Sequence, residues 1–474
     1  MRRTLFLIPH EIAGVPFFGV GWLLAALVIF IVVRLAITAI WPARILAPSD
    51  GKSASADQPQ RATIGHVIKN EGGLWAFLGL IIVFLLPRLE LENLAGEPVG
   101  LPIRGYGMFL MLAAVCSVSL AAWRAQRAGL GADAIYRLAP WTFCGGLVGA
   151  RVFYVVQYFE DFLRPTWGET LSAMAAMTQG GLVVYGGFIG GFLASAWVVT
   201  RHRQPLWKLG DVIVPCIFVG LFFGRLGCLM NGCCYGGACE PNALSVQFPP
   251  SSNVYVDQLL TGKLIGITAR PHTGDEGGSD DDGEPSLEGK QVRRNKLWMV
   301  KSVDEGSLAD QAGVKPGEVL TFILDPGFAD LAPLDIPAED ALPGLAVLRD
   351  GELVARISPD QLPPRAEPVW ATQIISSVMA AVMLVVLLVL ERILHASGVH
   401  LDGILMLCGF IAYAVLRIVL EWVRVDEEGQ FGTSLSISQW VSLGVIAAST
   451  VALVFRLRSG DSGAKDDGEM ADAT

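Results

Sequence analysis

Long apolar runs separated by short polar loops dominate the pattern of hydrophobic and polar positions in this chain. A helix needs about 18 or more mostly apolar residues to cross the ~30 Å hydrocarbon core of a bilayer. The second run below is short and could instead be a buried or re-entrant segment. The pattern predicts an all-α polytopic membrane protein with nine candidate spans: 18–40, 72–88, 105–123, 139–158, 180–200, 210–228, 371–394, 403–423 and 437–456.

Composition agrees with a membrane protein and excludes several other classes. Of the 474 residues, 52% are hydrophobic and only 17% are charged, whereas soluble domains average about 25% charged residues. The formal net charge of −10 excludes a basic nucleic-acid binder, so no nucleic acid is expected among the partners. Acidic tracts at 275–284 and 466–472 carry much of this charge.

The charges of the loops predict the orientation of the spans. The loops after the first, third, fifth, seventh and ninth runs contain arginines or lysines, and such loops face the cytoplasm by the positive-inside rule. The amino terminus and the loop 229–369 are then extracytoplasmic, and the carboxyl terminus, with its acidic tail at 459–474, is cytoplasmic. Arg2 and Arg3 lie on the wrong side of this arrangement. The first run is too long for a signal peptide and is interpreted as a permanent anchor.

The long loop between the sixth and seventh runs contains a small β-rich insert. It begins with a loop and acidic linker at 241–289, whose Gly-rich part, 273–289, has the composition of a flexible segment. The residues 290–362 then predict strands, a short helix and a hairpin about Asp350-Gly351. The pattern GSLADQAGVKPGEVL resembles a PDZ domain, although the loop that binds a peptide carboxylate in such domains is missing. We expect a semi-independent module with a possible protein partner.

Glycines and charged residues inside the apolar runs are the next signal. Gly186 and Gly190, and likewise Gly187 and Gly191, have the small-xxx-small spacing that lets helices approach closely in lipid. Charged side chains in a span cost at least about 2.5–3.5 kcal/mol at its centre and usually serve a function. The eighth run places one tyrosine and three charged residues on one helical face: Tyr413, Arg417, Glu421 and Arg424. Glu421 can pair with both arginines, and the three charges could also form a purely structural triad.

A second group of polar residues surrounds the end of the sixth run. The stretch GRLGCLMNGCCYGG (224–237) places Arg225 before a Gly-rich turn, whose backbone amides can bind an anion. Tyr106 begins the third run, and Arg151 and Tyr185 lie deeper in the fourth and fifth. Several cations converging on one leaflet indicate an anionic lipid headgroup as ligand.

At these residues the chain resembles the bacterial prolipoprotein diacylglyceryl transferase family. The resemblance rests on IRGYG, GGLVGARVFYVV, GGLVVYGGFIGG, GRLGCLMNGCCYGG and YAVLRIVLEWVR, in this order and spacing. It implies a seven-helix core formed by 101–240 and 363–458, to which the extension 1–100 adds two membrane segments. The family signature has an asparagine at Cys228 and an acidic residue at Cys233, and many members have a histidine at Tyr185.

The resemblance also implies an activity and a set of site residues. The diacylglyceryl group of phosphatidylglycerol would be transferred to the lipobox cysteine of a preprolipoprotein in the bacterial inner membrane, releasing glycerol phosphate. The expected catalytic residues are Arg225, Arg417, Glu421, Tyr185 and Tyr106, with Glu421 orienting the arginines and the tyrosines relaying the thiol proton. Phosphatidylglycerol would be bound by Arg225, Arg417, Arg424, Arg151, Asn231, Gly232 and Gly236. No cofactor and no metal are expected.

The four cysteines near this turn have three interpretations. Cys233 or Cys234 could form a disulfide with Cys228 or Cys239 outside the cytoplasm. They could instead be free, small, buried residues. Zinc is the third possibility, although the C-x4-C-C-x4-C spacing does not match the usual ligand pairs.

Two rival functions stay open at this point. A transporter would need polar residues along a path through both leaflets or inverted repeats, and neither is evident. A catalytically degenerate family member acting as a lipid- or protein-binding module is favoured by the replacements at Cys228, Cys233 and Tyr185, while the arginines argue against it.

Overall fold

The computed structural model describes most of the chain and divides it into two compact units. The first contains Thr4–Arg104, and the second contains nearly all of the remaining described residues. The positions of the two units relative to each other are not defined, so each is described by itself. The described residues are 4–40, 44–45, 60–61, 64–93, 96–164, 166–175, 181, 183–250, 252–272, 297–325, 344–397, 402–421, 433 and 435–471.

The first unit is a helical hairpin joined to a small antiparallel sheet. Helices α1 (Trp22–Ile40) and α2 (Ile64–Leu80) correspond to the first two apolar runs, and α2 continues through a π-helical turn at Ile81–Leu85. The Arg34 guanidinium on α1 donates to the Glu71 carboxylate on α2 at 2.9 Å, so these two partly exposed charges are paired. The sheet has the order β1-β7-β6, and the short strands β2 and β3 form a separate hairpin: β1 Thr4–Pro9, β2 Glu11–Ile12, β3 Val15–Pro16, β6 Leu91–Glu92 and β7 Pro98–Arg104. Two further residue pairs, β4 Arg44–Ile45 and β5 Gln60–Arg61, form a bridge of their own.

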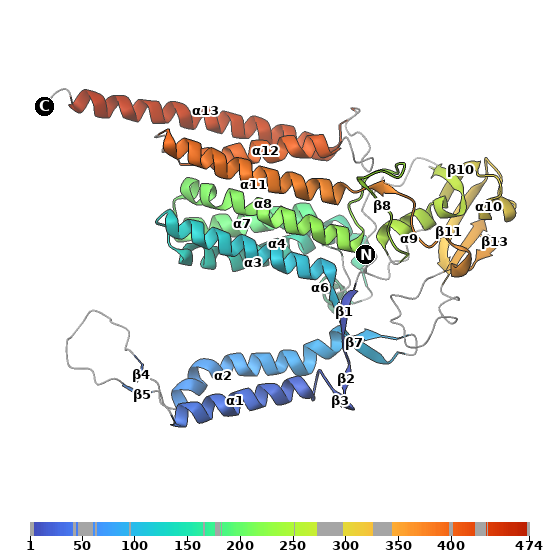
Figure 1. The fold of residues 1–474 in the computed structure, drawn as a ribbon, viewed down its shortest axis with the longest axis horizontal. Coiled ribbons are helices and arrows are strands. Elements are labelled where there is room, and N and C mark those ends of the chain that lie inside the picture. The colour runs from blue at the N-terminus through green and yellow to red at the C-terminus, as the bar shows by residue number, and fades with distance from the viewer. Residues whose placement is uncertain are drawn as a thin grey trace. The chain divides into compact units, whose positions relative to one another are not determined.

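The second unit contains a bundle of long helices that run side by side (Figure 1). Each of the other seven apolar runs falls on one of them. Across both units, eight helices in the described part of the chain are long and apolar enough to cross a membrane. Helix α7 occupies the position of the remaining run, 180–200. The helices are α3 Gly105–Arg127, α4 Ala132–Gln157, α7 Val184–Arg201, α8 Leu206–Asn231, α11 Thr372–Ala396, α12 Ile404–Glu421 and α13 Ile437–Ala471, with the short α5 Phe159–Phe162 and α6 Trp167–Ala175 between α4 and α7. The polytopic all-α fold is confirmed.

Glycines let α4 and α7 come into backbone contact. Gly149 on α4 faces Gly186 and Gly190 on α7, and a Cβ atom on Gly190 would lie 2.8 Å from the Gly149 Cα and would clash with the Gly145 carbonyl. By contrast, a Cβ atom on Gly191 would have its nearest neighbour at 3.4 Å. Only one of the two small-xxx-small pairs in this helix therefore lies in the close contact.

A buried arginine joins three helices near the start of α8, and the neighbouring Asp211 joins a fourth. The Arg124 side chain on α3 is 7% exposed and donates to both carboxylate oxygens of Glu391 on α11, at 2.8 and 2.9 Å. It also donates to the carbonyls of Asp211 and Val212 on α8. The Asp211 carboxylate in turn accepts the backbone N–H groups of Gly403 and Met406 at the start of α12. Because four unpaired donors remain at a helix N-terminus, this carboxylate caps α12.

The loop between α8 and α11 folds into a β-rich layer. A two-stranded ladder, β8 (Ser245–Val246) with β14 (Val369–Trp370), joins its two ends, and α9 (Asn253–Leu260) lies between. A five-stranded antiparallel sheet has the order β13-β12-β11-β10-β9, and the predicted hairpin at Asp350-Gly351 joins two of its strands. The strands are β9 Ile267–Pro271, β10 Leu297–Val303, β11 Val319–Asp325, β12 Gly344–Arg349 and β13 Glu352–Ile357, with α10 Leu308–Gln311 after β10.

This sheet shares one hydrophobic core with the rest of the loop. Leu320 and Leu345 in the sheet are fully buried in the same cluster as Val254 on α9, Leu229 in the last turn of α8 and Val369 before α11. Strand β9 also precedes the expected linker, 273–289, which lies outside the described residues. The insert is therefore packed onto the loop that carries it, and its kinship to PDZ domains stays a prediction.

The glycine contact leads to a first prediction. Gly190→Ala should lower the stability of the protein in detergent by about 1–3 kcal/mol, because the new methyl group overpacks the α4–α7 contact. Thermal unfolding of the purified protein measures this. Gly191→Ala is the matched control, since it adds the same methyl group in the same helix where there is room. Equal unfolding temperatures for the two variants would contradict the contact.

The buried arginine that joins α3, α8 and α11 leads to a second prediction. Arg124→Ala leaves Glu391 without its partner and two α8 carbonyls without donors, so we expect a loss of about 3–5 kcal/mol. Arg127→Ala is the control: Arg127 is exposed on the same last turn of α3 and stacks on Trp123. A loss no larger than the control's, in the same thermal assay, would show that the pair does not hold the bundle.

Candidate functional site

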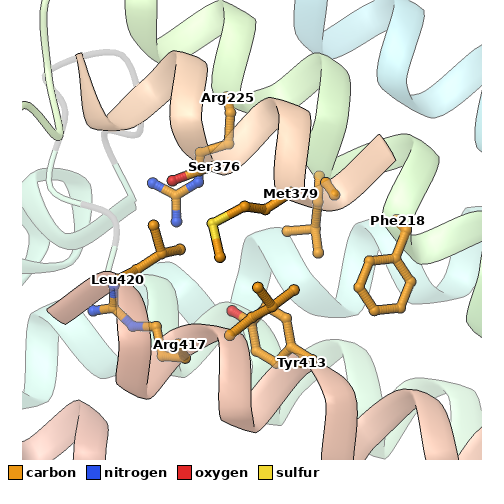
Figure 2. Close-up of a pocket in the computed structure, with 10 residues that line it drawn as sticks. Phe218, Arg225, Ser376, Met379, Tyr413, Arg417 and Leu420 are labelled. Atoms are coloured by element: carbon orange, nitrogen blue, oxygen red, sulfur yellow. The ribbon is translucent and has the colours of Figure 1, made fainter. Parts of the chain in front are cut away.

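A pocket opens between α8, α11 and α12 (Figure 2). The space between its lining residues, together with the adjoining open solvent, is about 380 Å³. Two arginines and Ser376 line one end, and Phe218 lies at the opposite end, so the pocket has a cationic and an apolar part. Its lining residues are Phe218, Leu221 and Arg225 from α8, Ser376, Met379 and Ala380 from α11, and Tyr413, Leu416, Arg417 and Leu420 from α12.

Arg225 supplies an open guanidinium. It is half-buried on α8, and its side chain points into the pocket from above in Figure 2. Within the described part of the chain, it has neither a hydrogen-bond nor an ion-pair partner. A half-buried guanidinium has five N–H donors that need acceptors. Its position therefore favours an anionic ligand in the pocket.

Arg417 is held in place by residues of α12 and α13. Its Nη2 atom donates to Ser438 Oγ on α13 at 2.8 Å and lies 3.3 Å from a Glu421 carboxylate oxygen. The two side chains are 16% and 7% exposed, so this ion pair is largely shielded from solvent. The pairing expected one helical turn apart is present. Arg424, the second expected partner of Glu421, lies outside the described residues.

The turn after α8 fixes the end of that helix. Gly232 has φ +71°, and its N–H group and that of Cys233 both donate to the Cys228 carbonyl. A Cβ atom on Gly232 would lie 2.9 Å from Ser252 Cβ, so both conformation and space require glycine. Asn231 is the last residue of α8, and the buried Gly236 donates its N–H to Trp370 O at 2.9 Å.

The first residues of α11 bind this turn from the other side. Thr372 Oγ1 donates to the Cys234 carbonyl at 2.6 Å, and Gln373 Nε2 donates to the Cys233 carbonyl at 2.7 Å. Gln373 is fully buried. These bonds fix the end of α8 against the start of α11, which places Arg225 and Ser376 on the same pocket.

Arg151 has a different environment from the one expected. It is 5% exposed, and it donates to the carbonyls of Ala173 and Met174 at the end of α6 and to Gly181 O, at 2.8–3.1 Å. It does not line the pocket. Its donors instead cap α6 and hold the segment that leads into α7.

The two expected tyrosines are also not seen in the pocket. Tyr106 packs on α8 at Gly227, where a Cβ atom would lie 3.3 Å from its ring. Residues two apart point about 200° from each other around a helix, so Gly227 and Arg225 face nearly opposite sides. Tyr185 lies in the first turn of α7, and its side chain is outside the described set.

The sequence did not lead us to two serines that build the site. Ser376 lines the pocket, and Ser438 holds Arg417. The available signal was the polar start of an otherwise apolar helix, because each polar group in a span needs a partner.

Comparisons with known proteins decide the family. A family model described as prolipoprotein diacylglyceryl transferase matches residues 96–455. A curated relative from Rhodopirellula baltica, named phosphatidylglycerol–prolipoprotein diacylglyceryl transferase, is 59% identical over 476 residues, which cover 98% of this chain and 90% of that protein. The chain belongs to the prolipoprotein diacylglyceryl transferase family.

More distant relatives match a smaller part of the chain. A protein of Clostridium perfringens, named phosphatidylglycerol–prolipoprotein diacylglyceryl transferase 2, is 29% identical over 33% of this chain and 59% of its own length. The Acinetobacter baumannii (strain ACICU) enzyme of this name is 34% identical over 30% of this chain and 52% of its own length. The family match begins at residue 96, after the α1–α2 hairpin, whereas the Rhodopirellula match is long enough to include most of that hairpin and of the insert.

Proposed function

We propose that this chain transfers the diacylglyceryl group of phosphatidylglycerol to the cysteine thiol of a preprolipoprotein lipobox. The cysteine sulfur attacks the glycerol carbon that carries the phosphate, a thioether forms, and the C–O bond to the phosphate breaks. Glycerol phosphate leaves, and the thiol proton is released. The family and the 59% identical relative support this activity. The observation that assigns this activity to a site is that Arg225 and Arg417 line the same pocket.

The two arginines have complementary roles in this proposal. The reaction develops negative charge on the departing phosphate, and fixed donors at developing charge contribute about 3–4 kcal/mol each. Arg417 is pre-oriented by Glu421 and Ser438, so little reorganisation is needed when the charge develops. Arg225 retains open N–H groups and binds the phosphate oxygens directly, with bidentate geometry available to it.

The remaining lining fits the lipid part of this substrate. Six of the other eight lining side chains are apolar, and Phe218 lies at the end of the pocket away from the arginines. A phospholipid has the same division, with an anionic phosphate at one end of its glycerol and acyl chains at the other. The proposal therefore places the phosphate between the arginines and the diacylglyceryl group along α8.

Removal of the thiol proton is the remaining step of this proposal. A thiol with pKa near 8.5 needs only modest help to ionise. Tyr185 is the first proposed proton acceptor, and Tyr106, which packs on the other face of α8, is the second. In this proposal Asn231, Gly232 and Gly236 contribute to binding of phosphatidylglycerol by shaping the turn after α8. Arg151 contributes by holding the segment before α7 in place.

The proposal also assigns a place in the cell. The chain is a multi-pass protein of the bacterial inner membrane, with its amino terminus and the loop 229–369 extracytoplasmic and its carboxyl terminus cytoplasmic. The basic loops on alternate sides support this orientation. The sheet in that loop then lies on the side where lipoprotein precursors emerge, and we propose that it contacts precursors or a partner protein.

Replacing the open arginine tests the site. Arg225→Ala should lower transfer to a lipobox peptide about 10²–10³-fold, because one donor to the departing phosphate is lost. The assay uses purified protein, phosphatidylglycerol and the peptide, and measures a mass gain of one diacylglyceryl unit. Arg225→Lys should restore little, since the bidentate fork is lost. Arg201→Ala, an exposed arginine at the end of α7, is the control; near-normal transfer by Arg225→Ala would remove Arg225 from the mechanism.

A topology test checks the orientation. A reporter enzyme that is active only outside the cytoplasm, fused near residue 280, should be active, and one that is active only inside should not. The same pair fused after residue 471 should give the opposite result. Cytoplasmic activity near residue 280 would contradict the proposed side of the loop.

A further inference from the structure

Three cysteine thiols meet at the turn that follows α8. The Sγ atoms of Cys228, Cys233 and Cys234 all lie within 4.8 Å of one another. All three residues are half-buried, and none forms a disulfide. Cys239, five residues further on, does not belong to this group. Neither the transfer reaction nor the pocket uses these thiols.

The backbone is shaped so that two neighbouring cysteines face a third. Cys234 has φ +55°. Residues other than glycine rarely adopt this left-handed backbone conformation, which costs them about 1–3 kcal/mol. In extended chain, side chains of neighbouring residues point to opposite faces, whereas here those of Cys233 and Cys234 both reach Cys228. The bonds from Thr372 and Gln373 to their carbonyls hold this conformation.

The spacing of the sulfur atoms fits a shared metal ion. Metal–thiolate bonds to zinc are about 2.3 Å long, which places three sulfurs on one ion about 4 Å apart. Thiolates are soft ligands that select Zn²⁺ or Cu⁺ over harder cations. Within the described residues, no histidine or carboxylate completes the group. The protein therefore supplies three sulfur ligands. Zinc would take a water molecule as its fourth ligand, whereas Cu⁺ would need no fourth ligand.

The thiols must lose their protons when the ion binds. Thiolates, not thiols, ligate such ions, so binding of the metal releases the protons of the three thiols.

We propose that Cys228, Cys233 and Cys234 form a three-thiolate site for one soft metal ion, Zn²⁺ or Cu⁺, that braces the turn between α8 and α11. The sequence spacing C-x4-C-C-x4-C argues against a metal because it does not match the usual ligand pairs. The fold changes that argument, because the helix end and the left-handed residue bring all three sulfurs together. The ion is structural: it holds the turn that begins about two helical turns after Arg225, and it takes no part in transfer.

The test measures metal in the full-length protein. Protein purified without a histidine tag or chelator should contain about one zinc or copper ion per chain by mass spectrometry of the elements, and the element found identifies the ion. Replacing Cys228, Cys233 or Cys234 with serine should each lower the affinity at least about tenfold, since even indirect contacts to a metal contribute that much. Cys239→Ser is the matched control and should retain the metal.

A second measurement decides the matter if the variants fold poorly. Titration of the metal-free wild-type protein with Co²⁺ should give the intense thiolate charge-transfer absorption, and alkylation with mass spectrometry should show all three thiols protected until a chelator is added. Substoichiometric metal with no cobalt spectrum, or a disulfide among the three cysteines, would overturn the proposal. Both measurements are independent of transfer activity, so they stand apart from the proposed reaction.

Discussion

A guanidinium inside an apolar bundle needs acceptors, and this requirement organises the protein. Arg124 finds its acceptors in Glu391 and in two carbonyls of α8, which joins α3, α8 and α11. Arg151 finds them in the carbonyls of α6 and in Gly181. Arg417 finds them in Glu421 and Ser438. Each of these arginines stabilises the arrangement of helices because leaving it unpaired would cost several kcal/mol.

Arg225 differs from these residues in a way that matters for catalysis. Within the described chain it faces a pocket and not a carboxylate, so its electrostatic potential is available to a ligand. The helix that carries it is fixed at both ends, by Arg124 near its start and by the Gly232 turn at its end. A donor on a rigid element, with its charge not neutralised by the protein, is what stabilisation of a departing phosphate requires.

The sequence predicted the membrane helices well because their signal is local. Length and hydropathy suffice to find a span, and all nine runs fall on helices. The glycines of α7 show where this signal ends: Gly186 with Gly190 and Gly187 with Gly191 have the same spacing, and only the structure shows which pair meets α4. Arg151 could not be placed either, because its partners are backbone carbonyls, which any sequence offers.

The β-rich insert shows a similar limit and leads to a physical consequence. The alternation of apolar residues and the turn residues predict its strands and hairpin. They do not predict β9, the strand before the linker, or the core shared with Leu229 and Val369. Leu229 lies in the last turn of α8 and Val369 lies three residues before α11, and both belong to the same hydrophobic core as the buried residues of the sheet. Removing the sheet would expose apolar surface of the core that also contains these two residues. The insert is thus mechanically part of the structure that holds the pocket, whatever it binds on its outer surface.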